Sequence, residues 1–204
     1  EFNDTRVPPK TPTYFQKPLT ALNTHGGELI RPAGYKYVNY EGEMAVIIGK
    51  AGRHIPVEKA LEHVAGYSVF NEASVRGYQI GKGTQWTLGK NFDGTGAFGP
   101  DIVTADELPP GASPLRIMTR VNGKVQQDSN TDDLIFDVPT LVHELSKCMT
   151  LDPGDVILTG TPAGVGAPKQ TFLSVGDRVV AEIEKIGVLR NTVAEASAIR
   201  IAAE

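Results

Sequence analysis

Short apolar runs rich in Val and Ile, separated by Gly, recur along most of the chain, and this pattern is typical of β-strands. The runs lie around Met44–Ile48, Val64–Phe70, Ile117–Val121, Val156–Leu158 and Val179–Ile183. Asn122-Gly123 separates the third run from Lys124–Gln127, and it predicts a two-residue hairpin turn because both residues tolerate positive φ. The sequence therefore predicts a mainly β, mainly antiparallel domain.

Two segments have the pattern of helices. Pro56–His63 is short and begins with Pro. Asp137–Met149 begins with a capping Asp and repeats apolar residues with a period of about 3.6. Cys148 lies in that apolar stripe, so we expect a core thiol and not a nucleophile, and as the single cysteine it leaves no disulfide framework.

The first 35 residues differ from the rest in being rich in Pro, Thr and Gly. We expect a loop-rich arm with short strands over residues 1–35 and a metal-binding catalytic domain over residues 36–204. The chain opens at Glu1 and has no Met before Met44, so we expect further residues upstream of Glu1.

Composition and charge narrow the class of partner. The 204 residues are 40% hydrophobic with a net charge of -4, and Lys and Arg form no run. This argues against nucleic acid or an anionic membrane surface as the main partner. No apolar stretch approaches the roughly 20 residues of a membrane span, and no signal pattern opens the chain, so we expect a cytoplasmic protein.

The most informative motif is Glu41-Gly42-Glu43, at the start of an otherwise apolar strand. Alternation along a strand places both carboxylates on one face. Burying two like charges costs several kcal/mol each unless a cation compensates, and a hard divalent metal is one such cation. The alternative is a strand whose solvent face carries two glutamates.

Further candidate side chains follow two of the predicted strands. If the segment after Phe70 is helical, Glu72, Arg76 and Gln79 share one face. Lys90 lies in a glycine-flanked segment, and Thr161 lies in a glycine-rich turn whose N–H groups can face an anion. Taken singly, each of these features is also common in ordinary solvated turns.

Five blocks occur together in a specific order: Phe15–Pro18, Tyr40–Val46, Ala65–Glu72, a Gly89-Lys90 segment closing at Gly99-Pro100, and Pro153–Pro162. In this order they resemble the fumarylacetoacetate hydrolase family, from Tyr14 to Asn191. The resemblance implies the mixed β-sheet roll of that family's C-terminal domain, with few short helices.

The resemblance also implies a cofactor and a set of site residues. It implies Mg²⁺ or Mn²⁺ held by Glu41, Glu43 and a third acid at Glu72. Most relatives carry Asp at that third position, so the longer Glu72 either reaches the ion or orients a water. Substrate contacts are implied for Arg76, Gln79, Lys90 and Thr161, and catalytic roles for Lys90, Gln79 and Glu72.

The resemblance leaves the reaction open. We expect hydrolysis of a C–C bond in a small 2,4-dioxo acid of the acylpyruvate or fumarylpyruvate type. The alternatives are decarboxylation, isomerisation or hydration of a related 2-oxo dicarboxylic acid in aromatic catabolism, or a catalytically silent metal-binding homologue. Many members use a His-Glu base on a short lid, and no His precedes His25. Either that lid lies upstream of Glu1, which we expect, or the protein lacks the His-Glu pair. A homodimer is also implied.

Overall fold

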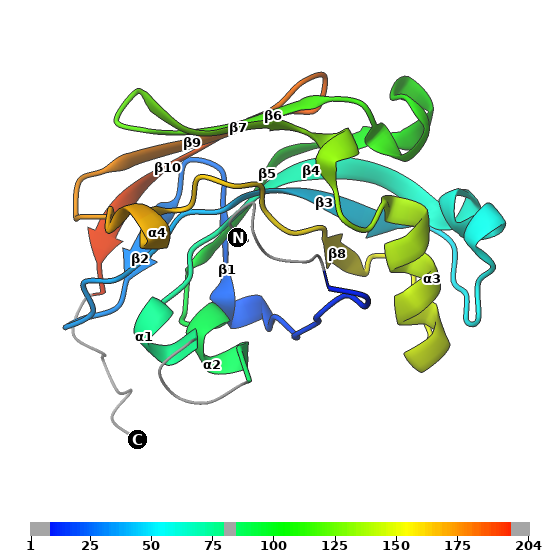
Figure 1. The fold of residues 1–204 in the computed structure, drawn as a ribbon, viewed down its shortest axis with the longest axis horizontal. Helices are drawn as coiled ribbons and strands as arrows, with labels where there is room; N and C mark the ends of the chain where they lie inside the picture. Colours follow the sequence, from blue (N-terminus) through cyan, green and yellow to red (C-terminus); the bar gives the residue numbers. More distant parts are fainter. Residues whose placement is uncertain (1–8, 80–84, 197–204) are drawn as a thin grey trace.

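Two five-stranded sheets pack against each other in the computed structural model, which describes residues 9–79 and 85–196 (Figure 1). Sheet A has the order β1 (Leu22–Thr24), β5 (Gly96–Thr104), β4 (Val64–Glu72), β3 (Gly42–Ile48) and β8 (Val156–Leu158). Sheet B has the order β2 (Glu28–Arg31), β10 (Gly187–Glu195), β9 (Arg178–Ile183), β6 (Arg116–Val121) and β7 (Lys124–Asn130). The predicted fold class, mostly β with few short helices, is confirmed.

Most strand pairs are antiparallel, as the sequence predicts. Each predicted apolar run lies in a strand, and β6 and β7 form the predicted hairpin, with Asn122 and Gly123 both at positive φ. The exceptions are two short strands near the start of the chain. There β1 pairs in parallel with β5 and β2 in parallel with β10, so this segment contributes one strand to each sheet.

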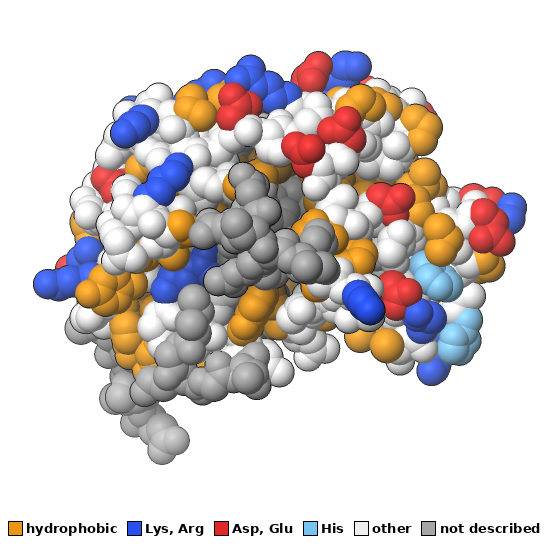
Figure 2. Space-filling model, viewed as in Figure 1, with side chains coloured by type: hydrophobic (Ala, Val, Ile, Leu, Met, Phe, Trp, Pro, Cys, Tyr) orange, Lys and Arg blue, Asp and Glu red, His pale blue; other side chains and the backbone are white. Residues whose placement is uncertain are grey.

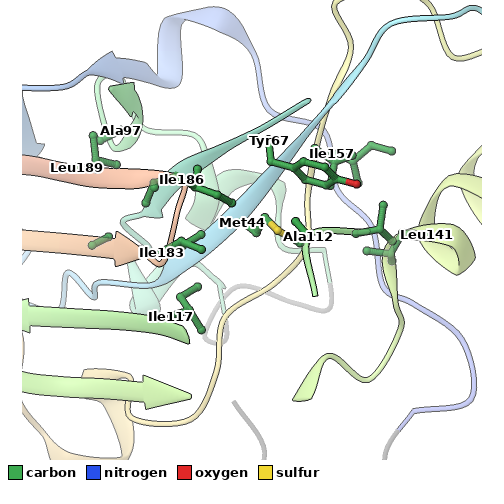
Figure 3. Packing of buried hydrophobic residues seen from close by; sticks show 14 of the residues in the cluster. Met44, Tyr67, Ala97, Ala112, Ile117, Leu141, Ile157, Ile183, Ile186 and Leu189 are labelled. Carbon is green, nitrogen blue, oxygen red and sulfur yellow. The ribbon is translucent and has the colours of Figure 1, made fainter. Parts of the chain in front are cut away.

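The core lies between the sheets, and alternation along β3 decides which residues enter it. Met44, Val46 and Ile48 point into the apolar cluster, to which sheet B contributes Ile117 and Ile183. Figure 3 shows Met44, Ile117 and Ile183 in this layer. The alternate residues of β3 face the opposite side of sheet A, and this side carries the glutamates.

The helices are short, apart from α3 (Val138–Cys148), which packs against a 3-10 helix at Val57–His63. The other α-helices are α1 (Arg76–Gln79), α2 (Thr87–Lys90) and α4 (Gly166–Lys169). Further 3-10 helices span Leu19–Ala21, Ala105–Glu107, Pro110–Ala112 and Thr131–Asp133. None of the helices in residues 9–79 and 85–196 combines the length and apolar character that crossing a membrane requires.

Helix α3 confirms its predicted start and corrects one expectation at its end. Asp137 caps it, accepting a hydrogen bond from the Thr140 N–H at 2.9 Å. Cys148 is exposed, so the predicted core thiol is wrong. The helix ends at Cys148, and its last buried residue is Ser146, whose hydroxyl oxygen accepts a hydrogen bond from the Ile55 N–H. Burial along the helix therefore ends at Ser146, before the apolar stripe reaches Cys148.

Candidate active site

Three glutamates share the face of sheet A that points away from the core. The Glu72 N–H donates to the Glu41 carbonyl at 2.8 Å, so these residues stand opposite each other on neighbouring strands. Glu43 follows on the same face of β3, two residues from Glu41. Exposed fractions are 1% for Glu41, 5% for Glu43 and 0% for Glu72. The predicted solvent-exposed alternative for Glu41 and Glu43 is therefore wrong.

Glu41 is surrounded by donors from elements distant in sequence. Lys90, at the end of α2, binds Glu41 Oε2 at 2.6 Å. Arg76, at the start of α1, binds Glu41 Oε1 at 3.0 Å, and the Ser74 hydroxyl donates to the same oxygen at 2.8 Å. The structure thus brings together Glu41, Arg76 and Lys90, three of the residues that the sequence singles out.

Arg76 also orients Gln79. Its NH1 donates to Gln79 Oε1 at 2.6 Å, within the single turn of α1. This bond fixes the amide so that Nε2 points elsewhere, and within the described part of the chain Gln79 Nε2 has no acceptor. Glu72 does not share this helix, since it ends β4, so the helical face predicted for all three residues exists only for Arg76 and Gln79.

Lys17 is a site residue whose role sequence reasoning missed. Its ammonium donates to Glu72 Oε1 at 2.9 Å and to the carbonyl of Lys90. Gly96 makes room for it, because a Cβ at position 96 would overlap Lys17 Cε and come within 2.7 Å of the Phe70 ring. The only available signal was the position of Lys17 in the Phe15–Pro18 block.

Glu43 has a different environment from the other two glutamates. Its Oε2 accepts a hydrogen bond from the Gly160 N–H at 2.9 Å. No Lys or Arg forms a salt bridge with it in residues 9–79 and 85–196. Burial, followed by repulsion from Glu41, raises the pKa of Glu43 to about 8. Burial also raises the pKa of Glu72, against the opposing charges of Lys90 and Lys17.

The three glutamates have the ligand type that a divalent cation prefers, but basic side chains bind Glu41 and Glu72 in this structure. Across the described residues, no group of three or more His, Cys, Asp or Glu side chains is gathered closely enough to hold an ion. Both oxygens of Glu41 instead bind Lys90 or Arg76. Glu72 Oε2 is buried without a hydrogen-bond partner among the described residues. The chemistry of the donor set, three carboxylates with one orphaned buried oxygen, therefore suits a hard cation, although the three side chains are not gathered around one point in this arrangement.

Thr161 lies in the turn after β8 and is tied to the strand that carries the glutamates. Its hydroxyl donates to the Gly42 carbonyl at 2.9 Å. Gln127, from β7 of sheet B, donates to the same hydroxyl at 2.7 Å and accepts from the Gly42 N–H at 3.0 Å. Sequence reasoning did not single out Gln127. The sequence feature that could have identified it is a polar residue at a position of the predicted hairpin strand that faces inward.

The outer face of sheet B is also charged, but its residues neutralise one another. Arg116 pairs with Asp128 and Arg120 with Glu182, and a hollow there is lined by Arg116, Met118, Glu182 and Glu184. Figure 2 shows side chains of both signs along the upper edge of the molecule. Exposed pairs of this kind are solvated and contribute little, so the candidate active site remains the glutamate face of sheet A.

Comparison with known proteins places this arrangement in a family. The family model described as fumarylacetoacetate (FAA) hydrolase C-terminal matches residues 2–194. A mitochondrial oxaloacetate tautomerase of Bos taurus is 44% identical over 190 residues, covering 91% of this chain and 60% of that protein. This chain therefore spans about three fifths of the length of that relative.

Solved structures agree. A 5-carboxymethyl-2-hydroxymuconate delta-isomerase from Mycobacterium smegmatis superposes with a TM-score of 0.85 at 39% identity, over 95% of this chain and 73% of that one. A maleylpyruvate hydrolase from Sphingobium sp. SYK-6 superposes with a TM-score of 0.80 at 33% identity, over 89% of this chain and 64% of that one. Glu1, which we expect to follow a catalytic lid, lies outside the described residues. The chain belongs to the fumarylacetoacetate hydrolase family.

Proposed function

We propose that the chain catalyses keto–enol tautomerisation or isomerisation of a small 2-oxo acid by stabilising its enolate. The observation that carries the proposal is the buried cluster in which Lys90 and Arg76 meet at Glu41 while Gln79 Nε2 has no acceptor among the described residues. Such a cluster offers positive charge for a carboxylate and an oriented donor for an oxygen that becomes negative.

Each side chain has a distinct task in this proposal. Lys90 and Arg76 bind the 2-oxo carboxylate, and Gln79 Nε2 donates to the oxo oxygen as charge develops on it. Glu72 is held by Lys17, and together with Glu41 and Glu43 it supplies the carboxylates that would hold Mg²⁺ or Mn²⁺. When bound, such an ion would supply Lewis-acid polarisation of the 2-oxo group. Thr161 contacts the far end of the substrate.

Two other functions remain as alternatives. Hydrolysis of a C–C bond in a 2,4-dioxo acid, our expectation from the sequence, releases the same kind of enolate, and it is favoured by the likeness to maleylpyruvate hydrolase. Tautomerisation ranks first because the mitochondrial relative, at 44% identity, is an oxaloacetate tautomerase. A silent homologue that has lost its base predicts metal binding without turnover.

A substrate panel tests the proposal. The protein is stripped with EDTA, reloaded with Mg²⁺ or Mn²⁺, and given enol oxaloacetate, a 2-hydroxy-2,4-dienedioic acid and an acylpyruvate. We expect fast loss of enol absorbance with intact carbon skeletons, checked by chromatography. Cleavage of the acylpyruvate with no tautomerisation would instead assign hydrolysis. No turnover of any substrate, with metal bound, would assign the silent homologue.

Gln79 provides the residue-level test. Gln79→Met removes the donor aimed at the developing oxyanion, so we expect kcat to fall on the order of 100-fold with a smaller change in KM. Gln85→Met is the matched control, since Gln85 is exposed and accepts a hydrogen bond from Thr87. Equal activity of the two variants would contradict the role of Gln79.

Light scattering of the same preparations tests the implied homodimer.

A further inference from the structure

Gln127 is a polar residue on the inner face of sheet B and is 1% exposed. Both the oxygen and the nitrogen of its side-chain amide form hydrogen bonds. Oε1 accepts from the Gly42 N–H at 3.0 Å. Nε2 donates to Thr161 Oγ1 at 2.7 Å and to the Pro162 carbonyl at 2.9 Å. One side chain of sheet B thus joins the strand between Glu41 and Glu43 to the turn after β8.

The partners of Gln127 fix the direction of its amide. The Gly42 N–H can only donate, and the Pro162 carbonyl can only accept. Exchanging Oε1 and Nε2 would set donor against donor at Gly42 and acceptor against acceptor at Pro162. Only the orientation described satisfies both.

This fixed amide determines the direction of the Thr161 hydroxyl. Because Gln127 Nε2 donates to Thr161 Oγ1, the hydroxyl proton must point away from it, and it goes to the Gly42 carbonyl at 2.9 Å. The hydroxyl has one lone pair left and no proton to offer. The Thr161 N–H, in contrast, has no acceptor among the residues that the structure describes.

We propose that Gln127 is a positioning residue that makes the Thr161 hydroxyl an acceptor, so that the Thr161 turn recognises a substrate group that can donate as well as accept a hydrogen bond. The inference rests on the proposed function, in which Thr161 lies at the far end of the substrate. A bare carboxylate can use only the Thr161 N–H and meets the lone pair of the hydroxyl. A hydroxyl, enol or amide can use both groups.

A matched pair of 2-oxo acids tests this polarity. Oxaloacetate and 4-hydroxy-2-oxobutanoate share the reacting end and differ in carrying a carboxylate or a hydroxymethyl group at the far end. KM for oxaloacetate and the inhibition constant of 4-hydroxy-2-oxobutanoate are measured for the wild-type protein, Gln127→Met and Gln127→Leu. Calorimetric binding of both acids gives the same ratio without turnover.

Loss of the Gln127 donor frees the Thr161 hydroxyl to rotate. We expect Gln127→Met and Gln127→Leu to weaken 4-hydroxy-2-oxobutanoate relative to oxaloacetate by up to about tenfold, the worth of one hydrogen bond. Gln126→Met is the matched control, because Gln126 is the neighbouring glutamine of β7 and contacts Tyr40 instead. It should leave the ratio unchanged.

The outcomes separate this inference from the proposed function. An unchanged ratio in folded Gln127 variants, with only a lower melting temperature, would overturn the inference and leave Gln127 as a structural clamp. Should both Gln127 variants fail to fold, Thr161→Ser and Thr161→Val replace them. Serine should keep the wild-type ratio and valine should lose it, and equal ratios would overturn the inference. Absence of wild-type turnover, with the binding ratio still dependent on Gln127, would overturn only the proposed function.

Discussion

The two faces of the strand at Glu41-Gly42-Glu43 differ in what they bury: one buries charged side chains, and the other packs closely against sheet B. On one face, Glu41 and Glu43 are buried carboxylates, and Glu41 is compensated by Lys90 and Arg76. On the other face, Gly42 presents no side chain at all, because Thr119 of sheet B fills the space where a Cβ would stand. The first face depends on charge and the second on volume.

The difference shows what each substitution would cost. A buried charge that loses its partner costs about 3–5 kcal/mol, since the remaining charge stays away from water. An extra methyl group in a packed core costs about 1–3 kcal/mol, since neighbours must move. The same tripeptide therefore has a charge-sensitive side and a size-sensitive side, and each can be broken separately.

Lys90→Met should have the largest effect. The Lys90 side chain is 3% exposed and its ammonium binds Glu41 Oε2 at 2.6 Å. Removing it takes the ammonium away from Glu41 Oε2 and leaves a buried carboxylate with less opposing charge, so we expect the free energy of unfolding in EDTA to fall by about 3 kcal/mol. Urea unfolding measures this loss. Mg²⁺ or Mn²⁺ should restore part of it if Glu41 is a metal ligand.

Lys59→Met is the control for that experiment. Lys59 also forms a salt bridge with a glutamate, Glu62, but both side chains are more than half exposed. Water screens this pair, so no measurable change in unfolding is expected. Equal losses for Lys59→Met and Lys90→Met would show that burial of the Glu41 pair is energetically unimportant.

Gly42→Ala tests the other face. The added methyl group would overlap the Thr119 hydroxyl, so we expect the free energy of unfolding to fall by about 2 kcal/mol. Thr119→Ala should rescue it, because the methyl carbon would then lie 3.6 Å from Cβ of residue 119. Urea unfolding of the two single variants and the double variant gives the coupling energy.

The control is contained in the same cycle. The Thr119 hydroxyl is buried and has no hydrogen-bond partner among the described residues, so Thr119→Ala alone should change stability little. If the losses of unfolding free energy of the two single variants simply add in the double variant, Gly42 is needed for a reason other than the volume that Thr119 occupies.

Much of the fold could be predicted because it depends on local pattern. Alternation along β3 placed Glu41 and Glu43 on one face, and Asn122-Gly123 gave the hairpin its turn. The pairings of β1 with β5 and β2 with β10 are parallel and join segments far apart in sequence. Neither strand carries a signal for its partner, so these pairings could not be predicted.

The candidate site shows the same limit. Glu41 and Lys90 were identified through motif blocks and Arg76 through the family resemblance, and the structure brings them together. Gln127 lies 85 residues from Gly42 along the chain, and Lys17 lies 55 residues from Glu72. Their roles arise from packing between elements, which the sequence around each residue does not record. The prediction that Cys148 is a core thiol was wrong for a related reason. The apolar stripe of α3 extends beyond the part of the helix that other elements cover.

The smallest predicted effect, taken per pH unit, is a dependence of stability on pH that belongs to the charged face alone. In the folded protein the pKa of Glu43 is about 8, above its ordinary value of 4.5, and the pKa of Glu72 is raised as well. Between pH 4.5 and about 8 the folded protein therefore holds a proton that the unfolded chain has released. Stability in EDTA should fall as pH rises through this window, by at most about 1.4 kcal/mol per pH unit for one proton.

Glu43→Gln removes one titrating group from that face, so its melting temperature in EDTA should fall less steeply with pH than that of the wild-type protein. Glu72 keeps its own contribution of the same sign, because its pKa is raised too. The Gly42→Ala, Thr119→Ala double variant changes only the packed face and should retain the wild-type slope. The assignment of charge to one side of β3 and volume to the other would be reversed by the opposite result. In that result the dependence of melting temperature on pH stays intact in Glu43→Gln and becomes flatter in the double variant.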